Sequence, residues 1–306
     1  ESRLTESPFF ARIHFMGTRL QRDQFVKSHA LGNDYIVLDE AQLSRPLTPD
    51  AVRRICDIHY GIGSDGILLL TAGAGADFGV RIFNPDGSEA EKSGNGLRIL
   101  AKFLYDHGYT DKPDFTVSTP GGRVRARLSL EDGRVSAITA DMGRATFVSS
   151  EIPVAGPRRE VVKETLEVAG RQFTVTAVSI GNPHCVIFAE TLDEDEVRRL
   201  GPAIEHHPSF PNRINVQFAK VLGRDRVSIL IWERGAGYTL ASGTSSCAVA
   251  SVCVKNGLTD RRVTIESPGG ELRVSVGESW DLTLTGPASE ICAGALSQDL
   301  LRSLSA

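Results

Sequence analysis

The sequence predicts an α+β protein made of two homologous lobes, each a curved and mainly antiparallel sheet around a central helix. Three observations lead to this prediction. A segment near residue 93 recurs near residue 242, several flanking motifs recur at the same separation, and short alternating stretches surround both copies. A chain of 306 residues is long enough to form two domains of ordinary size.

The repeated segment is 16 residues long, and it predicts one helix in each lobe. It runs from Ser93 to Gly108 and again from Ser242 to Gly257, which is 149 positions further along the chain. Apolar residues recur at helical spacing in both copies. Serine is a favoured N-cap and glycine a favoured residue just beyond a helix end. We therefore expect helices over 93–108 and 242–257.

Other motifs recur at the same separation, and this makes a chance match improbable. The pairs are Gly32-Asn33 with Gly181-Asn182, and 83–87 with 232–236. A third pair, the turns 119–122 and 267–270, is one residue out of step. Agreement at separate places predicts an internal duplication, with the two lobes facing one another.

Alternating apolar and polar residues predict strands with one buried face around each helix. Turn sequences separate these stretches. The predicted strands are 123–130, 135–142, 226–232, 262–267 and 271–276. We predict an N-terminal extension over 1–24, a first lobe over 25–137 that also includes about 288–306, and a second lobe over 138–287.

Composition excludes several classes of protein. Hydrophobic residues make up 41% and charged residues 24%, with a net charge of −4, so we expect neither nucleic acid nor an anionic membrane as partner. No apolar run approaches the roughly 20 residues of a membrane helix. Five cysteines without a close CxxC pair indicate buried, reduced thiols in a cytoplasmic protein and no metal site. The extension lacks the apolar run of a secretory signal, and a poorly ordered tail is expected, with a trimmed targeting segment as the alternative.

The two helix starts predict an anion site. The first turn of a helix has unpaired N–H groups and a partial positive charge. Glycine at Gly94 and Gly243 lets a ligand approach closely. If the lobes face one another, both helices point at one carboxylate, and Ser93 and Ser242 flank the ligand. Such a cleft suits an enzyme that removes a proton from one face of a carbon and returns it on the other. The alternative is that both serines are only N-caps.

Six motifs in a fixed order resemble those of the diaminopimelate epimerases. They are KSHALGNDY, GIGSDG, FNPDGSEAEKSGNG, IGNPHCV, FPNRINV and ERGAGYTLASGT. The likeness runs from about Phe25 to Gly294. The resemblance implies the fold of that family and an isomerase that works without metal or cofactor. It implies interconversion of LL- and meso-diaminopimelate, a step toward lysine and the cell wall, and exposed sheet edges leave a homodimer possible.

The resemblance also implies roles for individual residues. Ser93 and Ser242 stand where the family has two catalytic cysteines, and His184 and Glu233 match residues that assist proton transfer there. The positions that match the family's contacts to the distal amino-acid end are Asn33, Asn84, Asn182, Asn215, Glu233 and Arg234. Those that match the helix starts holding the reacting carboxylate are Gly94, Asn95, Gly243 and Thr244. Taken singly, each polar residue has an ordinary alternative as a turn residue or a surface ion pair.

Serine at both reactive positions is the departure that matters. A thiol has a reference pKa of about 8.5, which a helix N-terminus can bring into the working range, whereas a hydroxyl is a far weaker acid. We expect the chain as written to lose nearly all epimerase activity. Further departures are Ile58, Lys92, Tyr238 and Ser245, and they favour a divergent branch.

Three explanations of the serines stay open. Deliberate replacement would trap bound substrate, and it fits the five cysteines left elsewhere. A natural paralogue would bind or isomerise another amino acid. A non-catalytic amino-acid binding protein would keep the recognition residues and use the serines as caps.

A nucleotide-binding module is disfavoured because GxxxxGK[ST] is absent.

Overall fold

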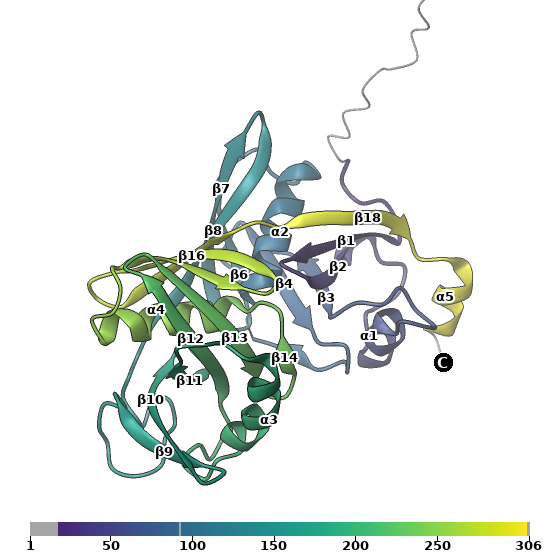
Figure 1. Ribbon diagram of the computed structural model, residues 1–306. Coiled ribbons are helices and arrows are strands. Elements are labelled where there is room, and N and C mark those ends of the chain that lie inside the picture. The colour runs from purple at the N-terminus through teal and green to yellow at the C-terminus, as the bar shows by residue number, and fades with distance from the viewer. Residues whose placement is uncertain (1–17, 92, 305–306) are drawn as a thin grey trace, which may run out of the picture.

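The computed structural model describes residues 18–91 and 93–304. Lys92 and the first seventeen residues of the predicted extension lie outside the described residues. Figure 1 shows two lobes side by side, with the first half of the chain and the C-terminal strand on one side and residues from β9 to β16 on the other.

The two repeats contain the same elements in the same order. The first contains β1 (Gln24–Ala30), β2 (Asn33–Asp39), α1 (Pro49–Cys56), β3 (Ile67–Thr71), β4 (Phe78–Phe83), β5 (Glu89–Ala90), α2 (Gly94–Asp106), β6 (Asp114–Thr119), β7 (Gly122–Glu131) and β8 (Arg134–Arg144). The second contains β10 (Arg171–Ser179), β11 (Pro183–Phe188), α3 (Glu194–Glu205), β12 (Asn215–Gly223), β13 (Arg226–Glu233), β14 (Gly237–Thr239), α4 (Gly243–Lys255), β15 (Arg262–Ser267), β16 (Gly270–Val276) and β17 (Asp281–Gly286). Outside this correspondence stand η1 (Glu40–Gln42), β9 (Glu164–Val168), β18 (Ser289–Ala295) and α5 (Gln298–Ser303).

Strand pairing confirms the predicted duplication. Ile36 of β2 pairs in parallel with Ile67 of β3, and Cys185 of β11 pairs in parallel with Val216 of β12. These are the same two positions, 149 residues apart. Most other pairings are antiparallel, as predicted. The predicted strands correspond to β7, β8, β13, β15 and β16.

Both predicted central helices are present with the predicted ends. Ser93 and Ser242 are the N-caps of α2 and α4, and each side chain accepts a backbone N–H of the first turn. Gly108 and Gly257 follow the helix ends with φ of +67° and +72°, a backbone conformation that glycine adopts readily. The segment between α4 and β15 is one residue shorter than that between α2 and β6, which explains the motif that is out of step.

Some strands of each lobe, among them β2, β3 and β11, are buried on both faces and are nearly continuous apolar runs. In β2, Val37 joins the core around α2 and α4, whereas Ile36 and Leu38 join a separate core beneath α1. In β11, Val186 and Cys185 divide in the same way between the central core and a core beneath α3. Helices α1 and α3 were not predicted from the sequence.

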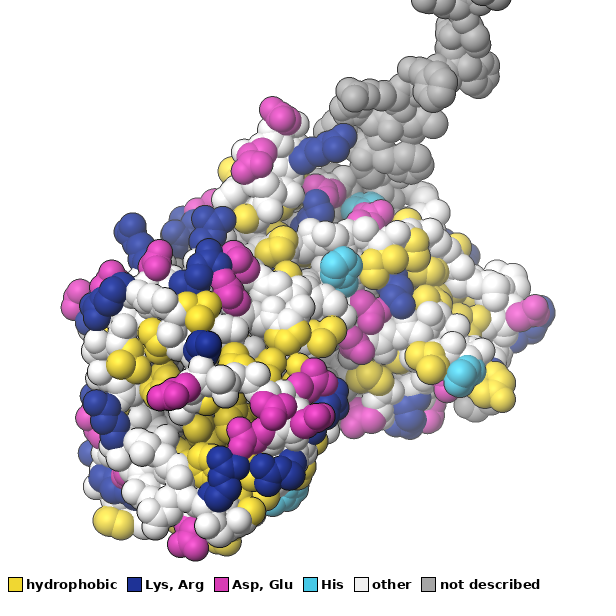
Figure 2. Space-filling view, viewed as in Figure 1, with side chains coloured by type: hydrophobic (Ala, Val, Ile, Leu, Met, Phe, Trp, Pro, Cys, Tyr) yellow, Lys and Arg dark blue, Asp and Glu magenta, His cyan; other side chains and the backbone are white. Residues whose placement is uncertain are grey.

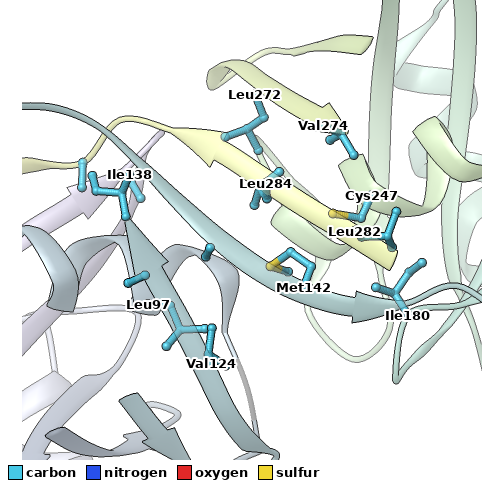
Figure 3. Close-up of a cluster of buried hydrophobic side chains, with 14 of the residues drawn as sticks. Leu97, Val124, Ile138, Met142, Ile180, Cys247, Leu272, Val274, Leu282 and Leu284 are labelled. Carbon is cyan, nitrogen blue, oxygen red and sulfur yellow. The ribbon is translucent and has the colours of Figure 1, made fainter. Parts of the chain in front are cut away.

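The lobes are joined by strands rather than by a flexible linker. β8 pairs antiparallel with β17, its counterpart, and the hydroxyls of Thr139 and Thr285 lie 2.8 Å apart. Figure 3 shows Met142 of β8 and Leu284 of β17 between the two lobes. β18 returns to pair with β1, which is the reason to propose that the C-terminal segment belongs to the first lobe. The proposed boundary at 137/138 falls within β8.

Two details differ from expectation. Cys292 is exposed on β18, because that strand faces outward, and only the other four cysteines are buried as predicted. Residues at the end of the predicted extension pack on the first lobe: Leu20 is buried, and its N–H donates to Tyr109 Oη.

Among the described residues, no helix is long and apolar enough to cross a membrane. The face seen in Figure 2 carries acidic and basic side chains intermixed over both lobes.

Candidate functional site

The two helix starts meet at a pair of glycines. A Cβ added to Gly94 would lie 3.5 Å from the Cα of Gly243, and the reverse distance is the same. Because neither position carries a side chain, the first turns of α2 and α4 come close together here. The N–H groups of both first turns therefore converge on one small region, which is the arrangement expected of an anion site.

A side-chain amide supports each helix start, and the two arrangements are equivalent. Asn95 Nδ2 donates to Asn33 Oδ1 at 3.1 Å in the first lobe. In the second lobe, Asn182 Nδ2 donates to Thr244 Oγ1 at 3.5 Å. Asn33 and Asn182 are themselves 149 positions apart. The duplicated fold thus brings four of the predicted binding residues to the junction of the helices.

Ser93 lies beside a tyrosine that sequence reasoning missed. The hydroxyls of Tyr35 and Ser93 are 3.3 Å apart. Tyr35 is buried, and this burial raises the pKa of its phenol. The carboxylate of Glu233 also raises the pKa of Tyr35, so a charged group of the opposite lobe acts on this phenol. Ser93 Oγ also accepts the N–H of Gly96 at 3.0 Å.

Ser242 lies beside Glu233, at the end of β13. Burial raises the pKa of the Glu233 carboxyl, and the hydroxyls of Ser242 and Thr239 partly offset this rise. Ser242 is buried, and its Oγ accepts the N–H of Ser245 at 3.4 Å. The structure thus places a carboxyl beside one predicted reactive position and a phenol beside the other.

His184 is fully buried in the second lobe and has a defined tautomer. Gln217 Nε2 donates to its Nδ1 at 3.1 Å, so Nε2 carries the proton and donates to Asn182 Oδ1 at 2.9 Å. Burial lowers the pKa of His184 to about 3, and the charge of Arg234 adds to this effect. The imidazole is therefore neutral at physiological pH. Gln217, which also donates to Ser245 Oγ at 3.0 Å, was not foreseen.

The remaining predicted residues, Asn215, Arg234 and Asn84, differ in burial and in their hydrogen-bond partners. Asn215 is buried, donates to Pro183 O at 2.7 Å and accepts the N–H of Arg234 at 3.0 Å. The guanidinium of Arg234 is exposed and donates to Asn212 O. Asn84 makes a local hydrogen bond to Ser88 at 3.0 Å, and no described contact joins it to the other predicted residues.

The internal repeat contained a signal for the missed tyrosine. Tyr35 is the counterpart of His184 at the repeat separation, so the search for a partner of His184 in the first lobe leads directly to it. Tyr238, where the family motif has glutamate, lies against α3, with the guanidinium of Arg198 4.3 Å from its ring centroid.

Two cavities lie elsewhere in the molecule. One of about 430 Å³ lies between Tyr60 and Leu300, and another of about 460 Å³ lies near Phe188 and Leu258. No group of three or more metal-ligating side chains occurs within the described residues. The helix junction, with titratable groups on both sides, is the arrangement that best suits an acid–base reaction on a small anion.

Comparisons with known proteins agree on one family. A family model described as diaminopimelate epimerase matches residues 25–148 and 176–291. Over 278 residues the chain is 46% identical to diaminopimelate epimerase 2 of Nostoc sp. strain PCC 7120, which covers 90% of this chain and 96% of that protein. Over 272 residues it is 43% identical to a diaminopimelate epimerase of Pelotomaculum thermopropionicum, with 88% and 97% covered.

Solved structures share the fold at low sequence identity. A hydroxyproline epimerase from Agrobacterium vitis with bound trans-4-hydroxy-L-proline has a TM-score of 0.67 and 16% identity, covering 90% of this chain and 92% of that one. A probable proline racemase from Agrobacterium radiobacter K84 with bound carbonate has a TM-score of 0.66 and 15% identity, covering 90% and 93%.

Proposed function

The chain belongs to the diaminopimelate epimerase family, and from this premise we propose that it holds one α-carbon of diaminopimelate between Ser93 and Ser242. The family makes it an isomerase that interconverts the LL and meso forms. The observation that carries the proposal is the meeting of two helix starts at Gly94 and Gly243. A carboxylate at this junction receives N–H groups from both helices, which leaves its α-carbon between the two hydroxyls.

The two faces of that carbon meet different groups. Glu233 lies beside Ser242 and Tyr35 lies beside Ser93, while neutral His184 is hydrogen-bonded to Asn182 in the second lobe. A two-base epimerase requires one group to accept a proton while another donates one from the opposite face. Each N–H of the helix starts favours negative charge that develops on the carboxylate as the proton leaves.

The amide groups around the junction suit the distal end of the same substrate. A zwitterionic amino-acid group requires acceptors for its ammonium and donors for its carboxylate. The proposed contacts are Asn33, Asn84, Asn182, Asn215, Glu233 and Arg234. The exposed guanidinium of Arg234 uses Nη1 for Asn212 O, and its other donors can bind a carboxylate while the backbone N–H stays bound to Asn215.

Serine limits the reaction in the chain as written. Neither hydroxyl reaches the acidity of a thiol, so we expect binding with strongly reduced turnover. We propose that cysteine at both positions restores α-proton exchange.

Deuterium exchange at the α-carbon of diaminopimelate in heavy water tests this proposal. The native chain is compared with Ser93→Cys/Ser242→Cys and with each single substitution. Ser297→Cys, which alters the N-cap of α5, is the matched control. Exchange that appears only in the double variant supports the proposal. Binding of diaminopimelate without exchange in any variant would contradict it.

A second candidate function is amino-acid binding without catalysis. Both serines already serve as N-caps, and Ser93 has good capping geometry at 3.0 Å. Under this candidate, the native chain and the double variant bind the same amino acid equally well and neither exchanges its α-proton. Calorimetric titration with a panel of free amino acids identifies such a ligand.

We also propose a cytoplasmic location, in which the buried thiols stay reduced, and a homodimer. Light scattering on the purified chain measures the oligomeric state.

A further inference from the structure

Arg98 is the largest side chain that is completely buried, and no described carboxylate forms an ion pair with it. It lies in the second turn of α2, and its guanidinium donates to three neutral oxygens. Nη1 donates to Gly94 O at 3.2 Å, Nη2 to Asn95 Oδ1 at 2.8 Å and Nε to Pro287 O at 3.3 Å. Burial lowers the pKa of Arg98 to about 10, so the guanidinium remains charged at neutral pH.

This position is costly for a cation. Charge taken out of water without an opposite charge is destabilising, even when hydrogen bonds satisfy its donors. The positive end of the α2 dipole lies close by and adds to this cost, since cations are favoured at the other end of a helix. A structural role alone would be served by a neutral side chain of similar size. The retention of charge points to a negative partner that arrives from outside.

The guanidinium stands behind both helix starts. Its Nη1 contacts the carbonyl of Gly94, and it would lie 3.7 Å from a Cβ at Gly243. Through Asn95 it connects to Asn33. Its full charge therefore adds to the two partial charges of the helix N-termini at the place where their N–H groups converge.

The repeat explains why there is a single arginine. Position 247 is the counterpart of position 98, and Cys247 lies close enough to Arg98 to act on its pKa, in the upward direction. Equivalent positions of the two helices thus approach one another, as Gly94 and Gly243 do. One repeat supplies the charge at this position and the other a small residue.

We propose that Arg98 is a positioning residue that supplies the fixed positive charge of the carboxylate site, with the ligand carboxylate as its counter-ion. The inference rests on the proposed function for the identity of that ligand. It does not require the native chain to turn over, because the effect is on binding. Arg98 acts through the helix starts and through Asn95 rather than by a contact of its own with the substrate.

The experiment separates the charge of Arg98 from its hydrogen bonds. Arg98→Lys keeps the charge with fewer donors, whereas Arg98→Gln keeps hydrogen-bonding groups without charge. Diaminopimelate binding to the full chain is measured by calorimetry, with Arg127→Gln as the exposed control. Loss of a charged interaction predicts binding weaker by about 30-fold for Arg98→Gln and by only about 3-fold for Arg98→Lys. Equal losses, or a larger loss for Arg98→Lys, would overturn the proposal.

A second measurement is independent of diaminopimelate and of exact affinities. Acetate is added to each folded protein, and the melting temperature is compared with that in chloride at the same ionic strength. Acetate should raise the melting temperature of the native chain and of Arg98→Lys but not of Arg98→Gln. If acetate stabilises in this way while diaminopimelate does not bind, the proposed substrate is wrong and the role of Arg98 stands. If acetate stabilises all three proteins equally, or none, Arg98 does not supply the charge.

Discussion

The hydroxyl of Tyr35 lies 3.3 Å from that of Ser93, while the equivalent residue of the second lobe, His184, is hydrogen-bonded to Asn182 and Gln217. Duplicated positions therefore carry a phenol in one lobe and a neutral imidazole in the other. The two sides of the helix junction are alike in backbone and different in acid–base character.

Tyr35 should stabilise a negative charge at position 93. In a Ser93→Cys protein, the phenol would donate to the thiolate, and a hydrogen bond to the charged form lowers a pKa. Adding Tyr35→Phe should therefore raise the pKa of the introduced thiol by about 1 unit. The rate of alkylation as a function of pH measures it, with the exposed Tyr60→Phe as control. An unchanged midpoint would show that the phenol does not donate to this sulfur.

His184 should make the protein sensitive to acid. Its pKa is about 3 when folded and 6.5 in the reference state, so between these values the unfolded chain binds one more proton. The free energy of unfolding should fall as the pH drops through this window, by up to about 1.4 kcal/mol per pH unit. His184→Gln should flatten this slope in urea titrations, and His59→Gln, an exposed change, should leave it intact. Equal slopes in all three proteins would contradict the assignment.

Glu233 should have the opposite pH dependence. Its folded pKa is raised above 4.5, so the folded chain holds the proton more tightly, and stability falls as the pH rises through the window above 4.5. Glu233→Gln removes this penalty. The stability of this variant relative to the native chain should therefore increase between about pH 4 and about pH 8. Thermal unfolding at a series of pH values measures the difference. The exposed Glu131→Gln should run parallel to the native chain, and a parallel curve for Glu233→Gln would refute the prediction.

Gly243→Ala should weaken ligand binding more than it weakens the fold. The new Cβ would lie 2.9 Å from a terminal methyl of Leu284, which can shift, and 3.5 Å from the Cα of Gly94, so it would occupy the space between the starts of α2 and α4. We expect diaminopimelate affinity to fall by about tenfold or more, although alanine favours helix over glycine. Gly223→Ala, whose Cβ would meet only a side-chain oxygen of Asp225 at 3.6 Å, is the matched control. Equal affinities in the two variants would show that the close approach is unnecessary.

Most of the fold could be predicted because the duplication repeats every local signal. Ser93 and Ser242 head helices that end at glycines in both copies, and two imperfect signals at a fixed separation reinforce each other. Helices α1 and α3 were missed because they lie outside the repeated motifs. Thr48 followed by Pro49 is a typical helix start, and it was available in the sequence.

The site was less predictable, because its missed members are polar residues within buried apolar segments. Tyr35 stands at the start of an apolar run, where its ring alone explains its burial. Arg98 lies between apolar helix residues, and on a surface helix such an arginine would simply face solvent. Only the packing of α2 against the second lobe encloses it, and that is a long-range property no local pattern contains.

The pairing of β18 with β1 has a consequence for synthesis. A ribosome releases the chain from the N-terminus, so β1 is synthesised long before β18, the strand with which it pairs. β8 likewise waits for β17. The first lobe cannot complete its sheet before β17 and β18 have been made, and until then β1 and β8 present open strand edges that could pair with other chains.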